Sequence, residues 1–100
     1  MARREYKIES IMINDAVINL VVIDDHYMMK HSDHISDELI LDLVKLLNGI
    51  DQQPDRSTNG FSYFVNLLTL NEKQYRLIWL MEDHRLYVGV INAYRDDRKE

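Results

Sequence analysis

Residues 61–93 read FSYFVNLLTL NEK QYRLIWLM EDHR LYVGVINA, and this stretch predicts most of a sheet. It holds three runs rich in β-branched, aromatic and aliphatic residues, at 61–70, 74–81 and 86–93, separated by three and four polar residues. Connections this short join strands that are antiparallel neighbours. The stretch therefore predicts a three-stranded antiparallel meander.

Both faces of the middle run carry apolar side chains. Strand alternation places Tyr75, Leu77, Trp79 and Met81 on one face, and Arg76, Ile78 and Leu80 on the other. We expect one face to pack against helices. The other face is expected to meet an N-terminal hairpin or a partner, because large exposed apolar patches usually mark interfaces.

Upstream of the meander the pattern predicts a β-hairpin. Tyr6–Ile13 and Ala16–Ile23 are rich in β-branched residues, and they flank the pair Asn14-Asp15. Asparagine and aspartate tolerate the positive φ angles that a tight hairpin turn requires.

Two helices are predicted after the hairpin. A short one is expected over Asp24–His31, which starts with a capping acid and contains no helix breaker. The second is expected over Ser36–Asn48, where Ser36 can cap the first turn and Gly49 follows as a left-handed stop. Residues 50–60 hold the only proline and no apolar period, so a surface loop is expected there.

Together these elements predict a single α+β domain over residues 1–100: an N-terminal β-hairpin, two helices and a three-stranded antiparallel meander on which the helices pack. The composition, 46% hydrophobic and 29% charged, is that of an ordinary globular protein. The chain has no cysteine, which favours a cytoplasmic location. No signal peptide is visible and the longest apolar runs fall far short of the roughly 20 residues of a membrane span, so no membrane partner is expected.

The net charge of −5 disfavours a broad nucleic-acid-binding surface, because an acidic protein repels phosphates. Motifs for a nucleophilic serine, a reactive thiol or a phosphate-cradling loop are absent from the sequence. No cofactor is predicted.

Three histidines suggest a metal site. His26, His31 and His34 lie close together with Asp25 and Asp33, and imidazole and carboxylate groups are zinc ligands. Exposed or capping histidines on a polar helix are the simpler interpretation, because no fourth ligand has a suitable spacing. The sequence therefore predicts no metal.

A second polar set could cleave RNA. His26 and Lys30 are one helical turn apart, Arg76 lies on a strand, and Tyr94 and Arg95 end the last strand. RNA cleavage needs a base for the 2′-hydroxyl, an acid for the leaving oxygen and fixed positive charge, and these side chains supply all three. The alternative is structural: Lys30 and Arg95 are solvated, and Arg76 pairs with an acidic residue across the sheet.

Two segments resemble known toxins. DHYMMKH (25–31) followed by ISDELI (35–40) resembles a pattern of small bacterial toxin-like domains of the BrnT kind. YRLIW (75–79) with YVGVINAYR (87–95) is similar to the final hairpin of RelE/ParE-type toxins. The resemblance implies a metal-independent mRNA endoribonuclease of a bacterial toxin-antitoxin system, with His26, Lys30, Arg76, Tyr94 and Arg95 as its catalytic residues.

The competing hypothesis is a non-catalytic interaction or regulatory module, whose second sheet face around Trp79 and Tyr87 binds protein. The partners considered are a cognate antitoxin or another protein, RNA, and a second copy of the chain.

Overall fold

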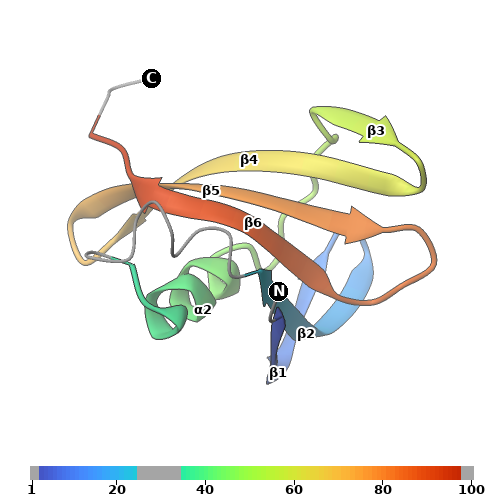
Figure 1. Cartoon of the computed structure of the whole chain (residues 1–100), viewed down its shortest axis with the longest axis horizontal. Helices are drawn as coiled ribbons and strands as arrows, with labels where there is room; N and C mark the ends of the chain where they lie inside the picture. The colour runs from blue at the N-terminus through green and yellow to red at the C-terminus, as the bar shows by residue number, and fades with distance from the viewer. Residues whose placement is uncertain (1–2, 25–34, 98–100) are drawn as a thin grey trace.

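Six strands join in one mixed sheet in the part of the chain that the structure describes, residues 3–24 and 35–97 of a computed structural model (Figure 1). The elements, in chain order, are β1 (Arg3–Ile13), β2 (Ala16–Asp24), α2 (Asp37–Lys45), β3 (Arg56–Thr58), β4 (Phe61–Leu70), β5 (Lys73–Glu82) and β6 (Val88–Arg95). The strand order across the sheet is β1-β2-β6-β5-β4-β3.

The predicted α+β fold class, two helices packed on a three-stranded meander, is wrong. The structure is mostly β, because the hairpin extends the meander: Val21–Ile23 of β2 lie parallel to Val88–Val90 of β6. The described residues contain one helix, α2, and the helix expected over 24–31 lies, beyond Asp24, outside them. Local patterns indicate hairpins well, but no local pattern indicates which distant strands pair.

The hairpin turn predicted at Asn14-Asp15 is confirmed, and a turn of the same kind joins β4 to β5. Asn14 and Asp15 have φ angles of 50° and 65°, and Asn71 and Glu72 have 53° and 66°. Two successive left-handed residues give a turn whose twist matches that of the flanking strands. These turns fix the β1–β2 and β4–β5 registers, so that Ile13 lies opposite Ala16 and Leu70 opposite Lys73.

The loop predicted over residues 50–60 contains a strand. Arg56–Thr58 forms β3 and pairs antiparallel with Phe61–Tyr63. The turn between them uses Asn59 and Gly60, with φ angles of 54° and 83°. The sequence pattern missed β3 because it is three residues long and polar.

Helix α2 begins where predicted and ends earlier. The Leu39 amide donates to the Ser36 hydroxyl at 3.1 Å, which satisfies one of the unpaired N–H groups of the first turn. The helix ends at Lys45, and Gly49 (φ 88°) lies in the turn beyond it. The Gly49 amide instead donates to the Met12 carbonyl at 2.7 Å, so the sheet captures the chain directly after the helix.

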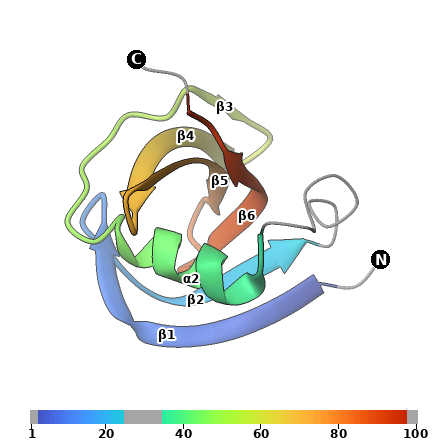
Figure 2. The same ribbon diagram turned by 90° about the vertical axis from the view of Figure 1, so that its left-hand side faces the viewer.

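The core lies between α2 and one face of the sheet, and Figure 2 shows the helix across the concave side of the bent sheet. Trp79 is fully buried and stacks on Phe64 with ring centroids 4.1 Å apart. The predicted alternation on β5 is confirmed, because Tyr75 and Leu77 are buried with Trp79 while the intervening residues are half-buried. That second face is not covered by α2, and the hairpin lies beside it in the same sheet.

A network of hydrogen bonds between side-chain amides crosses the edge of the core. The Trp79 indole N–H donates to Asn66 Oδ1 at 2.9 Å, and Asn66 Nδ2 donates to Gln52 Oε1 at 2.8 Å. Gln52 makes two hydrogen bonds with Asn14. The Gln52 main-chain amide donates to Asn14 Oδ1 at 2.7 Å, and Asn14 Nδ2 donates to the Gln52 main-chain carbonyl at 3.0 Å. This hydrogen-bond network connects β5, β4, the loop after α2 and the turn between β1 and β2.

Among the described residues, no helix has the length and apolar character needed to cross a membrane.

Candidate functional site

The predicted catalytic residues are only partly brought together. His26 and Lys30 lie outside the described residues. Arg76 and Tyr94 lie opposite each other across the β5–β6 pair, whereas Arg95 lies opposite Tyr75. Because successive strand residues point to opposite faces, Arg95 points away from the face that Tyr94 and Arg76 share.

Arg76 takes part in a structural ion pair. Its Nε donates to Asp96 Oδ2 at 2.6 Å, and the Asp96 side chain is 3% exposed. Asp96 is held in turn by Gln74, whose carbonyl accepts from the Asp96 amide at 3.0 Å and whose Nε2 donates to the Asp96 carbonyl at 2.9 Å. The structural alternative considered for Arg76, a pair with an acidic residue, is therefore present.

Arg95 lies on the surface. Its Nη2 donates to Asp97 Oδ1 at 2.8 Å, and this hydrogen bond raises the pKa of Arg95 above its ordinary value. Its guanidinium carbon is 5.7 Å from the centroid of the Tyr75 ring, on the side of the sheet that faces the core. Arg95 is thus positioned to shield Tyr75 and not to join Arg76.

The histidines of the metal hypothesis, His26, His31 and His34, lie outside the described residues, as do Asp25 and Asp33. Within residues 3–24 and 35–97, no group of three histidine or acidic side chains is placed to hold a metal ion.

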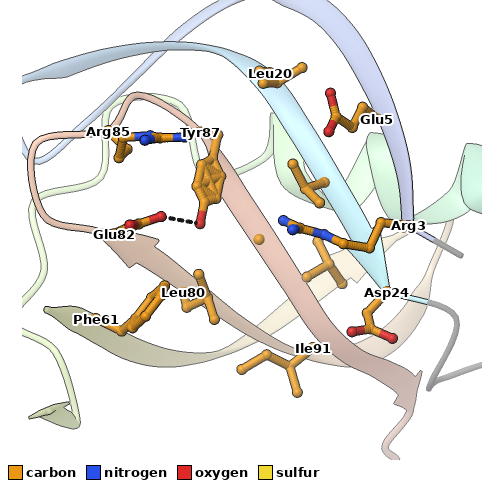
Figure 3. Close-up of a pocket in the computed structure, with 13 residues that line it drawn as sticks. Arg3, Glu5, Leu20, Asp24, Phe61, Leu80, Glu82, Arg85, Tyr87 and Ile91 are labelled. Atoms are coloured by element: carbon orange, nitrogen blue, oxygen red, sulfur yellow. Dashed lines mark hydrogen bonds between the residues drawn. The ribbon is translucent and has the colours of Figure 1, made fainter. Parts of the chain in front are cut away.

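A cavity of about 640 Å³ opens on the face of the sheet opposite α2 (Figure 3). Its floor is apolar and comes from strands β2, β5, β6 and β4, with Leu20, Val22, Leu80, Ile91 and Phe61 as contributors. These residues alternate along their strands with core residues such as Val21 and Trp79, which explains why they face away from the helix. The cavity therefore belongs to the sheet face that α2 does not cover.

Gly89 lines the cavity and lets the Leu80 side chain pack against β6. It lies opposite Leu80 in the β5–β6 register, and a Cβ atom at this position would lie 2.8 Å from Leu80 Cδ1. The missing side chain lets Leu80 lie flat over β6. A glycine inside a strand marks such a close approach, and this signal could have located the cavity from the sequence.

The rim of the cavity carries both signs of charge. Arg3 and Glu5 come from β1, Glu82 is the last residue of β5, and Arg85 lies in the connection from β5 to β6. In Figure 3, the Arg3 side chain extends from β1 toward the middle of the cavity, beside Tyr87. The rim therefore presents cations and carboxylates from two separate parts of the chain.

Tyr87 links the two sides of this rim electrostatically. Its hydroxyl donates to Glu82 Oε1 at 2.8 Å. Burial raises the pKa of Tyr87 above its usual value, the hydrogen bond to Glu82 raises it further, and Arg3 and Arg85 act in the opposite direction. Both guanidinium groups are thus close enough to act on one phenol.

The sequence located this surface only in part. Tyr87, which the competing hypothesis assigned to a protein-binding sheet face, lies at the cavity. Trp79, the other residue assigned to that face, is instead fully buried in the core on the α2 side. Arg3 and Glu5 could not be identified from the sequence, because they reach the cavity only where β2 lies next to β6.

Comparison of this chain with protein-family models, with curated proteins and with solved structures finds no match.

Proposed function

We propose that the chain is a non-catalytic binding module whose open sheet face holds a segment of a protein partner. The observation that carries this proposal is the apolar-floored cavity of about 640 Å³, rimmed by charges of both signs, on a sheet face that α2 leaves uncovered. Ligand sites typically combine such an apolar surface with a few convergent polar groups.

The chemistry at the rim supports binding more than catalysis. The Tyr87 hydroxyl donates to Glu82, and burial raises the pKa of Tyr87 further above an ordinary value that already lies far from neutral pH. A general base needs a group whose pKa lies near the working pH. Tyr87 therefore acts as a fixed hydrogen-bond donor that orients the Glu82 carboxylate.

The charges also favour a protein segment over RNA. Phosphate backbones are bound by clusters of cations, and their affinity falls where carboxylates line the same surface. Here Arg3 and Arg85 share the rim with Glu5 and Glu82. A peptide that inserts one apolar side chain between Leu80 and Ile91, flanked by charges of both signs, matches this distribution.

The test uses a library of random peptides displayed on phage, selected on the wild-type chain and counter-selected on a Leu80→Glu variant. We expect the selected peptides to carry an apolar residue between charged ones, and to shift the backbone NMR signals of Leu20, Leu80 and Ile91. Calorimetry with the synthetic peptides should show at least about a tenfold loss of affinity in Leu80→Glu. Thr69→Glu, an exposed site on β4, serves as the matched control and should bind normally.

Two results would contradict the proposal. One is a selection that yields no peptide specific for the wild-type chain. The other is a set of peptides that bind the wild type and Leu80→Glu equally well, with both proteins folded by circular dichroism.

The endoribonuclease hypothesis stays a prediction. It requires His26 and Lys30, outside the described residues, to join Arg76 and Tyr94. Expression in bacteria should then arrest growth, and His26→Ala or Tyr94→Phe should relieve the arrest. Harmless expression at high level would argue strongly against this activity.

A further inference from the structure

Strand β1 forms one edge of the sheet and is 11 residues long, whereas β3 at the other edge has three residues. The C-terminal end of β1 is covered by residues 48–50, which follow α2. The amide of Asn14 donates to the Ile50 carbonyl at 2.9 Å, and the Met12 carbonyl and amide bond to Gly49 and Asn48. In the described part of the chain, no such bond reaches residues 5–9 on the side away from β2.

The open part of β1 has hydrogen-bonding groups ready for another strand. Lys7 pairs with Leu20, and Ile11 pairs with Ile18, two positions along β2. The β1–β2 register is regular over Arg3–Lys7 and shifts between Lys7 and Ile11, so the outward direction of the Met12 main-chain groups does not extend to Lys7. Backbone groups alternate along the regular segment Arg3–Lys7, so every second residue of it presents its N–H and C=O to the open edge.

The exposed side chains of this edge alternate in sign. Arg3, Glu5, Lys7 and Glu9 are all exposed, and they read positive, negative, positive, negative along one face of the strand. Tyr6 and Ile8, between them, pack against the core from the other face.

This charge pattern is complementary to itself in one antiparallel register. With Tyr6 opposite Tyr6 of a second copy, Arg3 lies opposite Glu9 and Glu5 lies opposite Lys7. The two-fold symmetry makes each of these pairs twice. Opposite charges directly across a strand pair stabilise it, and like charges destabilise it.

Neighbouring registers are excluded by the same charges. A shift of two residues in one direction places Arg3 opposite Lys7 and Glu5 opposite itself. The shift in the other direction places Glu5 opposite Glu9 and Lys7 opposite itself. The register centred on Tyr6 is thus the one that pairs all four charges with their opposites. A shift of four residues leaves only one kind of opposite pair, Arg3 with Glu5 or Lys7 with Glu9.

We infer that the chain forms a symmetric dimer by antiparallel pairing of β1 with β1 of a second copy, centred on Tyr6. The two sheets become one continuous sheet, and the two cavities open on the same side of it. Glu9 of the second copy then lies beside Arg3 at the cavity rim, so each copy completes the rim of the other. This inference stands whether or not a peptide occupies the cavity.

Charged side chains on an edge strand also serve to prevent pairing. That role leaves the chain monomeric and makes the order of the charges irrelevant. The two possibilities differ in the behaviour of charge-reversed variants.

The test measures the mass of the full chain by sedimentation velocity, from about 1 μM to about 500 μM in low salt, where charge pairs are least screened. The wild type should dimerise. Glu5→Lys and Lys7→Glu should each raise the dimer Kd at least about tenfold, because each replaces two opposite-charge pairs by like-charge pairs.

Two complementary samples should restore the dimer. One is the double variant Glu5→Lys/Lys7→Glu, in which every pair is again opposite in sign. The other is an equimolar mixture of the two single variants, which should form a heterodimer although neither forms a homodimer. Glu72→Lys and Lys73→Glu make the same charge changes in the exposed β4–β5 turn and should leave the dimer intact.

Hydrogen exchange gives an independent reading, since those amides of residues 4–8 that face the open edge should exchange more slowly as the protein concentration rises. A wild type that stays monomeric throughout the range overturns the inference. So does a dimer that both single variants form as well as the wild type, because it then uses another surface.

Discussion

The Asn66 side chain, on β4, connects β5 and the loop after α2 by hydrogen bonds. Its carbonyl oxygen accepts from the buried Trp79 indole, and its amide donates to Gln52 in the loop after α2. A buried donor that loses its acceptor costs the full desolvation of that group. The stacking of Trp79 on Phe64 fixes the indole, so it cannot turn to find another partner.

We therefore expect Asn66→Ala to lower the free energy of unfolding by about 1–3 kcal/mol. Asn66→Asp, which keeps an acceptor for the indole, should cost less. The measurement is urea unfolding followed by the fluorescence of Trp79, the single tryptophan. The exposed Thr69→Ala on the same strand is the control, and a loss in Asn66→Ala no larger than in this control would show that the hydrogen-bond network is not stabilising.

Two tyrosines should titrate late. The hydrogen bond to Asp37 raises the pKa of Tyr6 most, and burial raises the pKa of Tyr87 most, both above the usual value of about 10. A raised folded-state pKa means that the stabilisation by each phenol is complete below about pH 10 and is lost as the pH rises through the folded-state value.

Absorbance near 295 nm should therefore show two ionisations later than those of a tyrosine peptide. Tyr6→Phe and Tyr87→Phe should each remove one of them. Glu82→Gln should bring the Tyr87 step to lower pH and leave the Tyr6 step unchanged. Two late steps that survive both phenylalanine substitutions would refute this assignment.

At the scale of the elements, β1 and α2 are fastened together by one carboxylate. Arg4 donates to Asp37 through Nε at 2.6 Å and Nη2 at 3.0 Å, and the Tyr6 hydroxyl donates to the same carboxylate. Asp37 is the first residue of α2, so these bonds place the start of the helix against the edge strand. Fork-shaped pairs between guanidinium and carboxylate are stronger than single hydrogen bonds.

Asp37→Asn should lower the free energy of unfolding by about 1–2 kcal/mol more than Glu38→Gln. Both residues lie in the first turn of α2, so each change removes the same favourable charge from the helix N-terminus. The side chains of Arg4 and Asp37 are 26% and 20% exposed, which limits the effect. Equal losses of unfolding free energy in the two variants would mean that Asp37 stabilises the protein through the helix dipole and not through its bonds to Arg4 and Tyr6.

Elements with local signals could be predicted from the sequence. The turns at Asn14-Asp15 and Asn71-Glu72, the cap at Ser36 and the strand Phe61–Leu70 all appear where their residues place them. Strand β3 could not be predicted, because three polar residues carry no periodicity and gain their pairing from β4.

At the scale of the molecule, the joining of hairpin and meander could not be predicted. It rests on residues 21–23 and 88–90, which are separated by more than half of the chain. The candidate site depends on that joining, because its floor takes Leu20 and Val22 from β2 and Ile91 from β6. The sequence therefore indicated an apolar sheet face without the charges of β1 that border it.

The joining should make the sheet unfold as one unit. Val88→Ala removes two buried carbons at the β2–β6 pair and should lower the free energy of unfolding by roughly 2–3 kcal/mol. Far-UV circular dichroism and Trp79 fluorescence should report the same shifted transition. Val17→Ala, the same change at a half-exposed site on β2, should cost less than about 0.5 kcal/mol. Separate transitions by the two probes would show that hairpin and meander unfold independently.

The parallel pairing of β2 with β6 also bears on how the protein is made. The ribosome synthesises β6 after all the other described strands, so the hairpin emerges long before its neighbour exists. Until then, the edge of β2 that carries Val21 and Ile23 has no strand beside it, and exposed strand edges are prone to pair with other chains. Slow translation of the stretch between the hairpin and β6 would lengthen this interval, so the yield of folded protein should depend on codon choice there.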